Sequence, residues 1–94
     1  MLILSLTYIA PIEAADEHMQ AHMAWVREGY DKGLFLASGR KVPRSGGVIL
    51  ARGDRAELEA ICAADPFTIH GIATYDITEV ALTTVAPGFE MLKA

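Results

Sequence analysis

Residues 2–38 decide the fold of this chain, and they read LILSLTYIAPIEAADEHMQAHMAWVREGYDKGLFLAS. Residues 2–9 alternate their side chains between two faces, with leucines and a tyrosine on one of them, which is typical of a β-strand. Residues 11–33 instead repeat apolar side chains at helical spacing and end in Gly33, a favourable residue just beyond a helix. Residues 34–38 form a second short apolar run. The stretch therefore predicts a strand, a helix and a strand.

The middle of the chain continues with a loop, a strand and a second helix. Residues 39–47 are rich in turn-forming residues and predict a loop, and residues 48–52 predict a third strand. Asp54 and the glutamate three residues later have the spacing of a capping box, which favours a helix starting there. Asp65 and Pro66 end or deflect this helix, because a residue before proline disfavours the helical conformation.

Residues 72–85 complete the pattern, because they are rich in Ile, Val, Thr and Tyr and predict a long last strand. The order strand, helix, strand, strand, helix, strand over residues 1–94 predicts a single α+β domain. We expect the ferredoxin-like arrangement, a four-stranded antiparallel sheet with two helices on one face. The other face also carries apolar side chains, so we expect a second subunit to cover it in a homodimer or a higher even oligomer.

Composition excludes several classes of function. The chain is 52% apolar with a net charge of −4, which provides no basic surface for nucleic acid. Arg40, Lys41 and Arg44 form the one positive cluster, interpreted as a solvated rim or as a weak anion site. The single cysteine, Cys62, excludes an intramolecular disulfide and favours a reducing compartment. No apolar stretch is long enough to cross a bilayer, and we expect a cytoplasmic protein.

His22 is the most unusual residue of the first helix. It falls on the apolar face, one turn from Met19 and from Val26. A buried imidazole needs hydrogen-bond partners, and its ordinary pKa lies close to neutrality. His22 is therefore a candidate for general acid–base catalysis or for a structural hydrogen bond in the core.

Two partners for His22 come from the sequence. His18 is one turn away, the spacing at which two histidines share a metal, but no third ligand is defined beyond His70 or a carboxylate, and no metal site is predicted. Asp65 lies where the second helix ends, a position at which a carboxylate opposes the helix dipole. It is interpreted either as a turn former or as the acceptor that orients the His22 ring for proton transfer.

Two segments carry a resemblance to a known family. Residues 21–39, AHMAWVREGYDKGLFLASG, and residues 63–67, AADPF, resemble the YciI-like (YCII-related) family of small proteins. The resemblance implies a ferredoxin-like dimeric α+β barrel and a His–Asp pair as the active site. By position, this pair corresponds to His22 and Asp65. One branch of the family resembles a dehydrochlorinase of chlorinated hydroxyquinols, and the barrel is shared with muconolactone isomerases.

The family's glycine after the second strand corresponds to Gly39, with Ser38 before it. The family usually has proline at the next position, where this chain has Arg40, so the shape of the loop and of the pocket rim is expected to differ. The resemblance implies that Ser38, Gly39 and Arg40 bind substrate. We expect a cavity between helix and sheet, walled by Met19 and Met23 or by the aromatic residues Trp25 and Phe35. Trp25 is otherwise a candidate for the core or for an interface.

Two functions remain open at this point. The first is a cofactor-independent lyase or isomerase that transfers a proton on a small cyclic or carboxylated molecule. In it His22 is the general acid–base group, Asp65 orients it, and Ser38 or Arg40 stabilises developing oxyanion charge. The second is a non-catalytic dimeric module that binds a small ligand or a partner, with a structural bond between His22 and Asp65. An open cavity at His22 favours the enzyme, and a sealed one favours the module.

Overall fold

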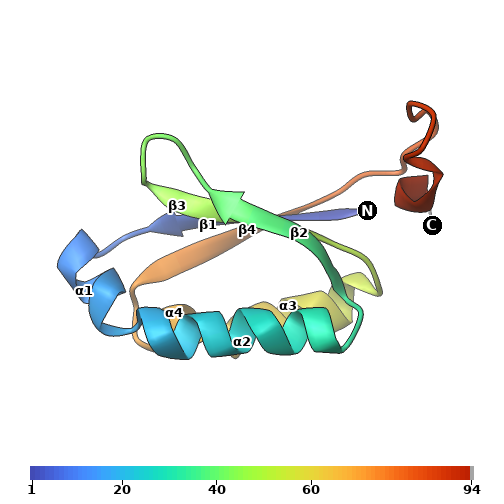
Figure 1. The fold of residues 1–94 in the computed structure, drawn as a ribbon. Helices are drawn as coiled ribbons and strands as arrows, with labels where there is room; N and C mark the ends of the chain where they lie inside the picture. Colours follow the sequence, from blue (N-terminus) through green and yellow to red (C-terminus); the bar gives the residue numbers. More distant parts are fainter. Residues whose placement is uncertain (94) are drawn as a thin grey trace.

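A four-stranded antiparallel sheet forms one layer of the protein (Figure 1). The structure is a computed structural model and describes residues 1–93. The strands lie in the order β2-β3-β1-β4, so that the two edge strands are β2 and β4. Their bounds are β1 (Leu2–Tyr8), β2 (Phe35–Arg40), β3 (Gly46–Ala51) and β4 (Ala73–Glu79).

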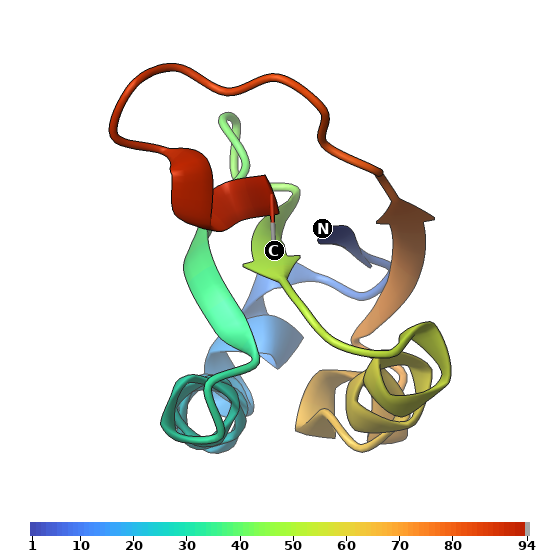
Figure 2. The ribbon, with the colours of Figure 1, turned by 90° about the vertical axis from the view of Figure 1, so that its right-hand side faces the viewer.

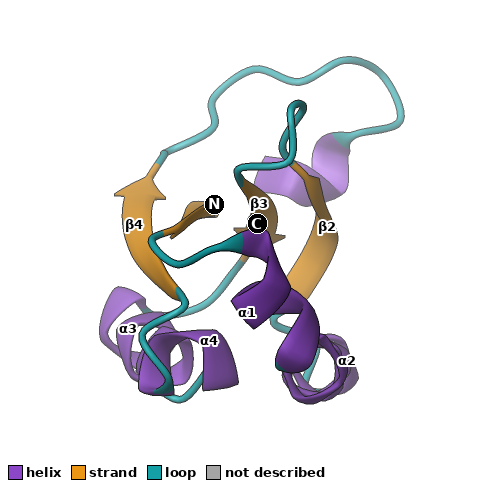
Figure 3. Cartoon of the chain, turned by 90° about the vertical axis from the view of Figure 1, so that its left-hand side faces the viewer, coloured by secondary structure: helices purple, strands orange, loops and turns teal. Residues whose placement is uncertain are grey.

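The α-helices of the described residues form a second layer on one face of this sheet (Figures 1 and 3). They are α1 (Ile12–Glu17), α2 (Met19–Asp31), α3 (Arg55–Ala63) and α4 (Pro66–Ile69), and a 3₁₀ helix, η1 (Glu90–Lys93), follows near the C-terminus. Figure 2 shows α2 below β2, with α3 and α4 below β4. This is the α+β, ferredoxin-like fold that the order of elements predicts.

Strict alternation in β1 builds the core between the layers. Leu2, Leu4 and Leu6 are buried, and the residues between them are more exposed. One core cluster contains Leu2 and Leu4 together with residues of α2 and α3. A second cluster contains Leu6 together with Phe67 of α4. The apolar face of β1 therefore packs against residues of all four α-helices, α2 and α3 in the first cluster and α1 and α4 in the second.

A β-bulge in β2 changes which of its residues face the helices. Phe35 pairs with Ala51, but Ala37 already pairs with the next residue of β3, so that Leu36 is the extra residue. A bulge of this kind reverses the alternation that follows it. As a result Ser38 and Arg40, and not Ala37, lie on the same face as the buried Phe35.

The predicted single helix over residues 11–32 is wrong in one respect, because it is divided at His18. The backbone N–H of His18 bonds to the carbonyl of Ala15, which tightens and ends α1. Packing gives the physical reason: α1 buries Ala15 against the cluster of Leu6 and Phe67, at one end of the sheet. Figure 1 shows α2 leaving this end to run along the sheet.

Two predicted boundaries are also wrong. The last strand ends at Glu79 instead of residue 85, because its neighbour β1 begins at Leu2, which pairs with Glu79. Among residues 1–93, the hydrogen bonds between Met1 and Val80 are the last that join these two segments. The loop predicted over residues 39–47 is shorter, since β2 continues to Arg40 and β3 begins at Gly46.

The predicted start of the second helix is confirmed. The Asp54 side chain accepts a hydrogen bond from the Glu57 backbone N–H at 3.2 Å, which caps α3. Within residues 1–93, no helix is long and apolar enough to span a membrane.

Candidate active site

Asp65 lies at the centre of the candidate site, in the tight connection between α3 and α4. Its side chain is completely buried, and the carboxylate Oδ1 accepts a hydrogen bond from the Phe67 backbone N–H at 2.9 Å. Asp65 therefore caps the N-terminus of α4, with Pro66 as the first helical residue. The short helix α4 is not expected from the sequence, and it gives the Asp65 carboxylate a favourable helix N-terminus in addition to the unfavourable C-terminus of α3.

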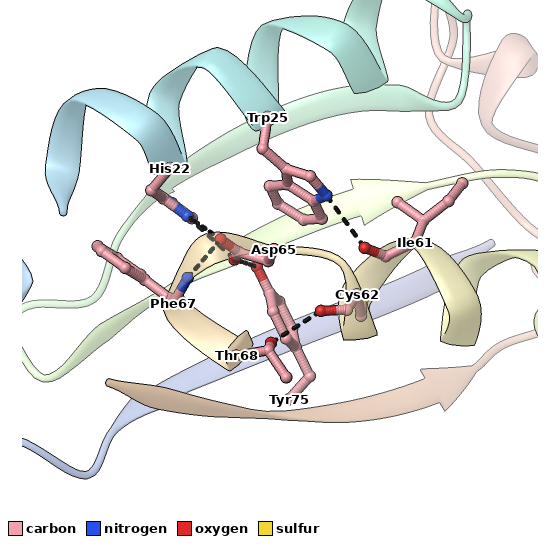
Figure 4. A network of polar contacts seen from close by, with 8 residues as sticks. All are labelled: His22, Trp25, Ile61, Cys62, Asp65, Phe67, Thr68 and Tyr75. Atoms are coloured by element: carbon pink, nitrogen blue, oxygen red, sulfur yellow. Dashed lines mark hydrogen bonds and ion pairs between the residues drawn. The ribbon is translucent and has the colours of Figure 1, made fainter. Parts of the chain in front are cut away.

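Two side chains from other elements reach the same carboxylate (Figure 4). His22, on α2, places its Nδ1 2.9 Å from Oδ1 and 3.0 Å from Oδ2. Tyr75, on β4, donates its hydroxyl to Oδ2 at 2.6 Å. The carboxylate thus links α2 to the connection between α3 and α4, and links both to strand β4.

The hydrogen bonds indicate how the His22 ring is protonated. Donors from three residues converge on the two oxygens of Asp65, the pattern of an ionised carboxylate, which can only accept. Nδ1 of His22 then carries the proton of this hydrogen bond, and in the neutral ring Nε2 has a lone pair. Among residues 1–93 no hydrogen bond occupies Nε2, which is therefore available to a ligand.

Burial, together with the charge of Asp65, keeps Tyr75 and Cys62 uncharged. Burial raises the pKa of Tyr75 far above its ordinary value, and the negative charge of Asp65 adds to the effect. Burial also raises the pKa of the Cys62 thiol to about 12, again with a contribution from Asp65. Tyr75 therefore remains a hydrogen-bond donor across the physiological range, and Cys62 is not a thiolate nucleophile.

Aromatic packing holds the His22 ring in its plane. The ring lies parallel to that of Phe67, with 4.0 Å between centroids, and its side chain is only 12% exposed. On the same helix, the Trp25 indole N–H donates to the carbonyl of Ile61 at 3.0 Å and packs against the core. These contacts fix α2 against α3 and α4, so the His22 ring is pre-oriented.

A cavity of about 370 Å³ lies beside His22, between α2 and the sheet. Its floor is formed by β1, β2 and β3, and it includes solvent-exposed residues, so it opens at the surface. The residues that line it are Leu6, Tyr8, Met19, His22, Met23, Val26, Ser38, Gly39, Arg40, Gly46, Gly47, Val48, Ile49 and Tyr75.

The structure brings most of the predicted site residues to this cavity. His22, Ser38, Gly39 and Arg40 line it, and Asp65 lies directly behind His22. Ser38 also forms a hydrogen bond of 2.7 Å with the hydroxyl of Tyr30. These are placements in the fold, and the catalytic and binding roles stay predictions.

Some predicted wall residues do not reach the cavity. Met19 and Met23 line it as expected, but Phe35 is buried in the core and Trp25 is turned toward Ile61. Tyr75 is the contact that the sequence interpretation missed. One signal was present: Tyr75 lies on the same face of β4 as Ile77, and an inward tyrosine hydroxyl requires a partner.

The other histidines lie apart from this network. His18 stacks on His70, with 4.2 Å between ring centroids, while His22 faces Asp65. Within the described part of the chain, no group of three potential metal ligands comes together.

Comparisons with known proteins concern the fold and the family of the chain. The model of the YCII-related domain matches residues 1–81. A similar solved structure is 5-chloro-2-hydroxyhydroquinone dehydrochlorinase (TftG) from Burkholderia phenoliruptrix AC1100, in complex with 2,5-dihydroxybenzoquinone. It has a TM-score of 0.70 and 17% sequence identity, and the match covers 85% of this chain and 93% of that one. No curated protein matches the chain.

Proposed function

Because the chain belongs to the YCII-related domain family, we propose that it is an enzyme that transfers a proton on a small cyclic molecule. One observation carries the proposal. His22 lines an open cavity of about 370 Å³, while its Nδ1 is held by a buried carboxylate. A purely structural bond between His22 and Asp65 requires no cavity at the ring, and a module that only binds a ligand requires no histidine held by a carboxylate there, so the combination of the two favours the enzyme.

In the proposed mechanism, His22 is the general base. Its Nε2 takes a proton from a ring carbon or hydroxyl of the substrate, and the ring becomes an imidazolium. Asp65 orients the ring through Nδ1–H and stabilises this positive charge. The Ser38 hydroxyl or the Arg40 guanidinium stabilises the negative charge that develops on a substrate oxygen. Every group in this proton transfer is a side chain, and we propose no cofactor.

The name of the similar structure supports this class of reaction. A dehydrochlorinase removes hydrogen chloride: a base accepts the proton, the electron pair of the broken bond to hydrogen moves into the molecule to form a new double bond, and chloride leaves with the electron pair of its bond to carbon. A histidine held by a carboxylate can supply that base. The bound molecule in that structure is a small oxygenated ring, and a ring of this size fits the volume found here.

The proposal is tested by proton exchange with solvent. Hydroxylated and chlorinated six-membered rings, including 5-chloro-2-hydroxyhydroquinone, are incubated with the protein in D₂O and followed by NMR for deuterium uptake or chloride release. We expect at least one compound to react, and His22→Gln to lower its rate by about 100-fold or more. The control is His70→Gln, a histidine outside the cavity, which should keep the rate.

The outcome depends on the folded state of the variants, which is checked by thermal unfolding. A His22→Gln protein that is folded and reacts as fast as the original chain would exclude His22 as the base. Complete inactivity of the original chain toward the whole panel would favour the non-catalytic module.

We further propose that two copies form a homodimer by stacking their sheets. The face of the sheet opposite the α-helices carries Ile3 and Leu50, which are cross-strand neighbours and only partly buried. Figure 1 shows the α-helices on the other side of the sheet. Two such faces, packed against each other, would remove this apolar surface from water.

A further inference from the structure

We propose that Arg40 selects negatively charged substrates, so that the ligand of the cavity is a small cyclic anion with a carboxylate or an ionised hydroxyl. The inference rests on the proposed function to the extent that it takes this cavity as the substrate site. It goes further in assigning the ligand's charge and its direction: the anionic oxygen at Arg40 and the reacting atom at His22.

The positive cluster of the sequence is divided by the structure. The Lys41 ammonium donates to the Thr7 hydroxyl at 3.1 Å. Arg44 forms an ion pair of 2.7 Å with Asp16 and lies over the ring of Tyr8. Arg40 alone has no hydrogen-bond or ion-pair partner among residues 1–93. Arg40 is also the one of the three cations that lines the cavity, so its charge is the one placed to meet a ligand there.

The backbone directs this free cation toward the cavity. Arg40 pairs with Gly47, and Gly47 pairs with the buried Leu6, so these positions share the helix-facing side of the sheet. The bulge at Leu36 puts Ser38 on the same side. Two residues of strand separate the Ser38 and Arg40 backbones by about 7 Å, the length of a six-membered ring with one substituent.

Charges around the cavity reinforce the selection. No carboxylate lines it in the part of the chain that the structure describes, and Asp65 is completely covered behind His22 and Tyr75. A bound anion with its charged oxygen at Arg40 therefore meets that positive charge with no carboxylate among the lining residues, while Asp65 lies behind the His22 ring. A neutral ring would leave that guanidinium paired only with water.

The remaining walls fit the rest of such a molecule. Met19, Met23 and Val26 form an apolar side from α2 that can pack on the face of a ring. Gly39 and Gly47 line the sheet side of the cavity and bring no side chain into it; a Cβ on Gly47 would come within 2.9 Å of the Gly39 carbonyl oxygen, so the close approach of the two strands requires glycine there. The cavity thus combines an apolar slot with one cationic end.

Equilibrium binding of benzoate and of benzamide tests the inference, because the two molecules have nearly the same shape and differ in charge. Affinities are measured by isothermal titration calorimetry at low ionic strength. We expect benzoate to bind about 5-fold more tightly than benzamide, a preference suited to an exposed charge and reduced by added salt. In Arg40→Gln the preference should disappear, and Arg40→Lys should keep most of it.

Arg27→Gln is the matched control. Arg27 is an exposed arginine of α2 outside the cavity, and its removal changes the net charge by the same amount. This variant should keep the preference. Equal affinities in the original chain, failure of benzoate to bind, a preference that survives Arg40→Gln, or an equal loss in Arg27→Gln would each overturn the inference.

The binding test is independent of turnover. A His22→Gln protein should still prefer benzoate if Arg40 selects the anion. If Arg40→Gln keeps the preference for benzoate while His22 proves essential for proton exchange, the proposed function is retained and the assignment of a negatively charged ligand is rejected. If instead Arg40→Gln loses the preference and His22→Gln does not slow proton exchange, the cavity is an anion-binding site and His22 is not the base.

Discussion

At the scale of the residue, the buried carboxylate of Asp65 explains most of the site. A fully buried anion is costly unless donors replace the water that it loses. Phe67, Tyr75 and His22 supply those donors from a turn, a strand and a helix. The same bonds that stabilise the fold also determine which nitrogen of His22 faces the cavity, so stability and the proposed chemistry depend on one group.

Tyr75→Phe tests the structural part of this network. The change removes the hydroxyl that donates to Asp65 and leaves the carboxylate one donor short. We expect the free energy of unfolding in urea to fall by about 1–3 kcal/mol, because hydrogen bonds to charged groups lie in this range. Tyr30→Phe is the control, since it also removes a tyrosine hydroxyl bond, the exposed one to Ser38.

The control should change stability by less than about 0.5 kcal/mol, as exposed sites usually do. Equal losses in the two variants would show that the contact with Asp65 adds nothing beyond an ordinary surface bond.

At the scale of the element, the close approach of α2 and β2 shapes the site. Gly29 is buried on α2, and an added Cβ would lie 2.2 Å from the ring of Phe35. The absence of a side chain lets the helix approach the strand, and the neighbouring bulge then turns Ser38 and Arg40 toward the helices. A glycine that weakens the helix intrinsically is therefore required by the packing.

Gly29→Ala tests this packing through the sign of the change in the free energy of unfolding. Helix propensity alone predicts a gain of about 1 kcal/mol for alanine. The overlap with Phe35 predicts the opposite, a loss of about 1–3 kcal/mol, because a crowded core must shift. We expect the loss, measured by chemical denaturation. Gly39→Ala, where a Cβ meets nothing within 4 Å, should leave stability unchanged or slightly higher; a stabilised Gly29→Ala protein would contradict the packing argument.

At the scale of the whole molecule, the two-layer architecture leaves one face of the sheet without α-helices. The segment after β4 leaves the end of the sheet and arches back toward the side of β2 (Figure 2). Phe89 and Met91 in this segment are 55% and 70% exposed. Like the apolar sheet face, exposed apolar side chains of this kind are surface that association with a second copy would remove from water.

Leu50→Lys tests that assembly. A charge at the centre of a face packed against its copy would be desolvated without a partner, so the dimer should dissociate. We expect sedimentation equilibrium to give twice the 10.1 kDa chain mass for the original protein and the single mass for the variant. Ala24→Lys, an equal added charge at an exposed position of α2 in the opposite layer, should remain dimeric. A monomeric original chain would exclude the proposal.

Much of the fold follows from local patterns. Alternating leucines in residues 2–6, the cap at Asp54 and the turn residues around Gly33 each act within a few positions, and the structure contains the elements that they predict. The errors concern boundaries, at His18 and Glu79, where a helix or a strand ends because its neighbour in space ends or turns.

The sequence by itself determined the order of elements, the sheet with helices on one face, and His22 as a polar group on an apolar helix. Only the tertiary structure decided what surrounds that group. The bond from Tyr75, the bulge that turns Arg40 inward and the pairing of Lys41 and Arg44 with other partners all join residues far apart in the chain. Periodicity describes which face of an element is apolar, whereas the partner of a particular atom depends on how those faces pack in space.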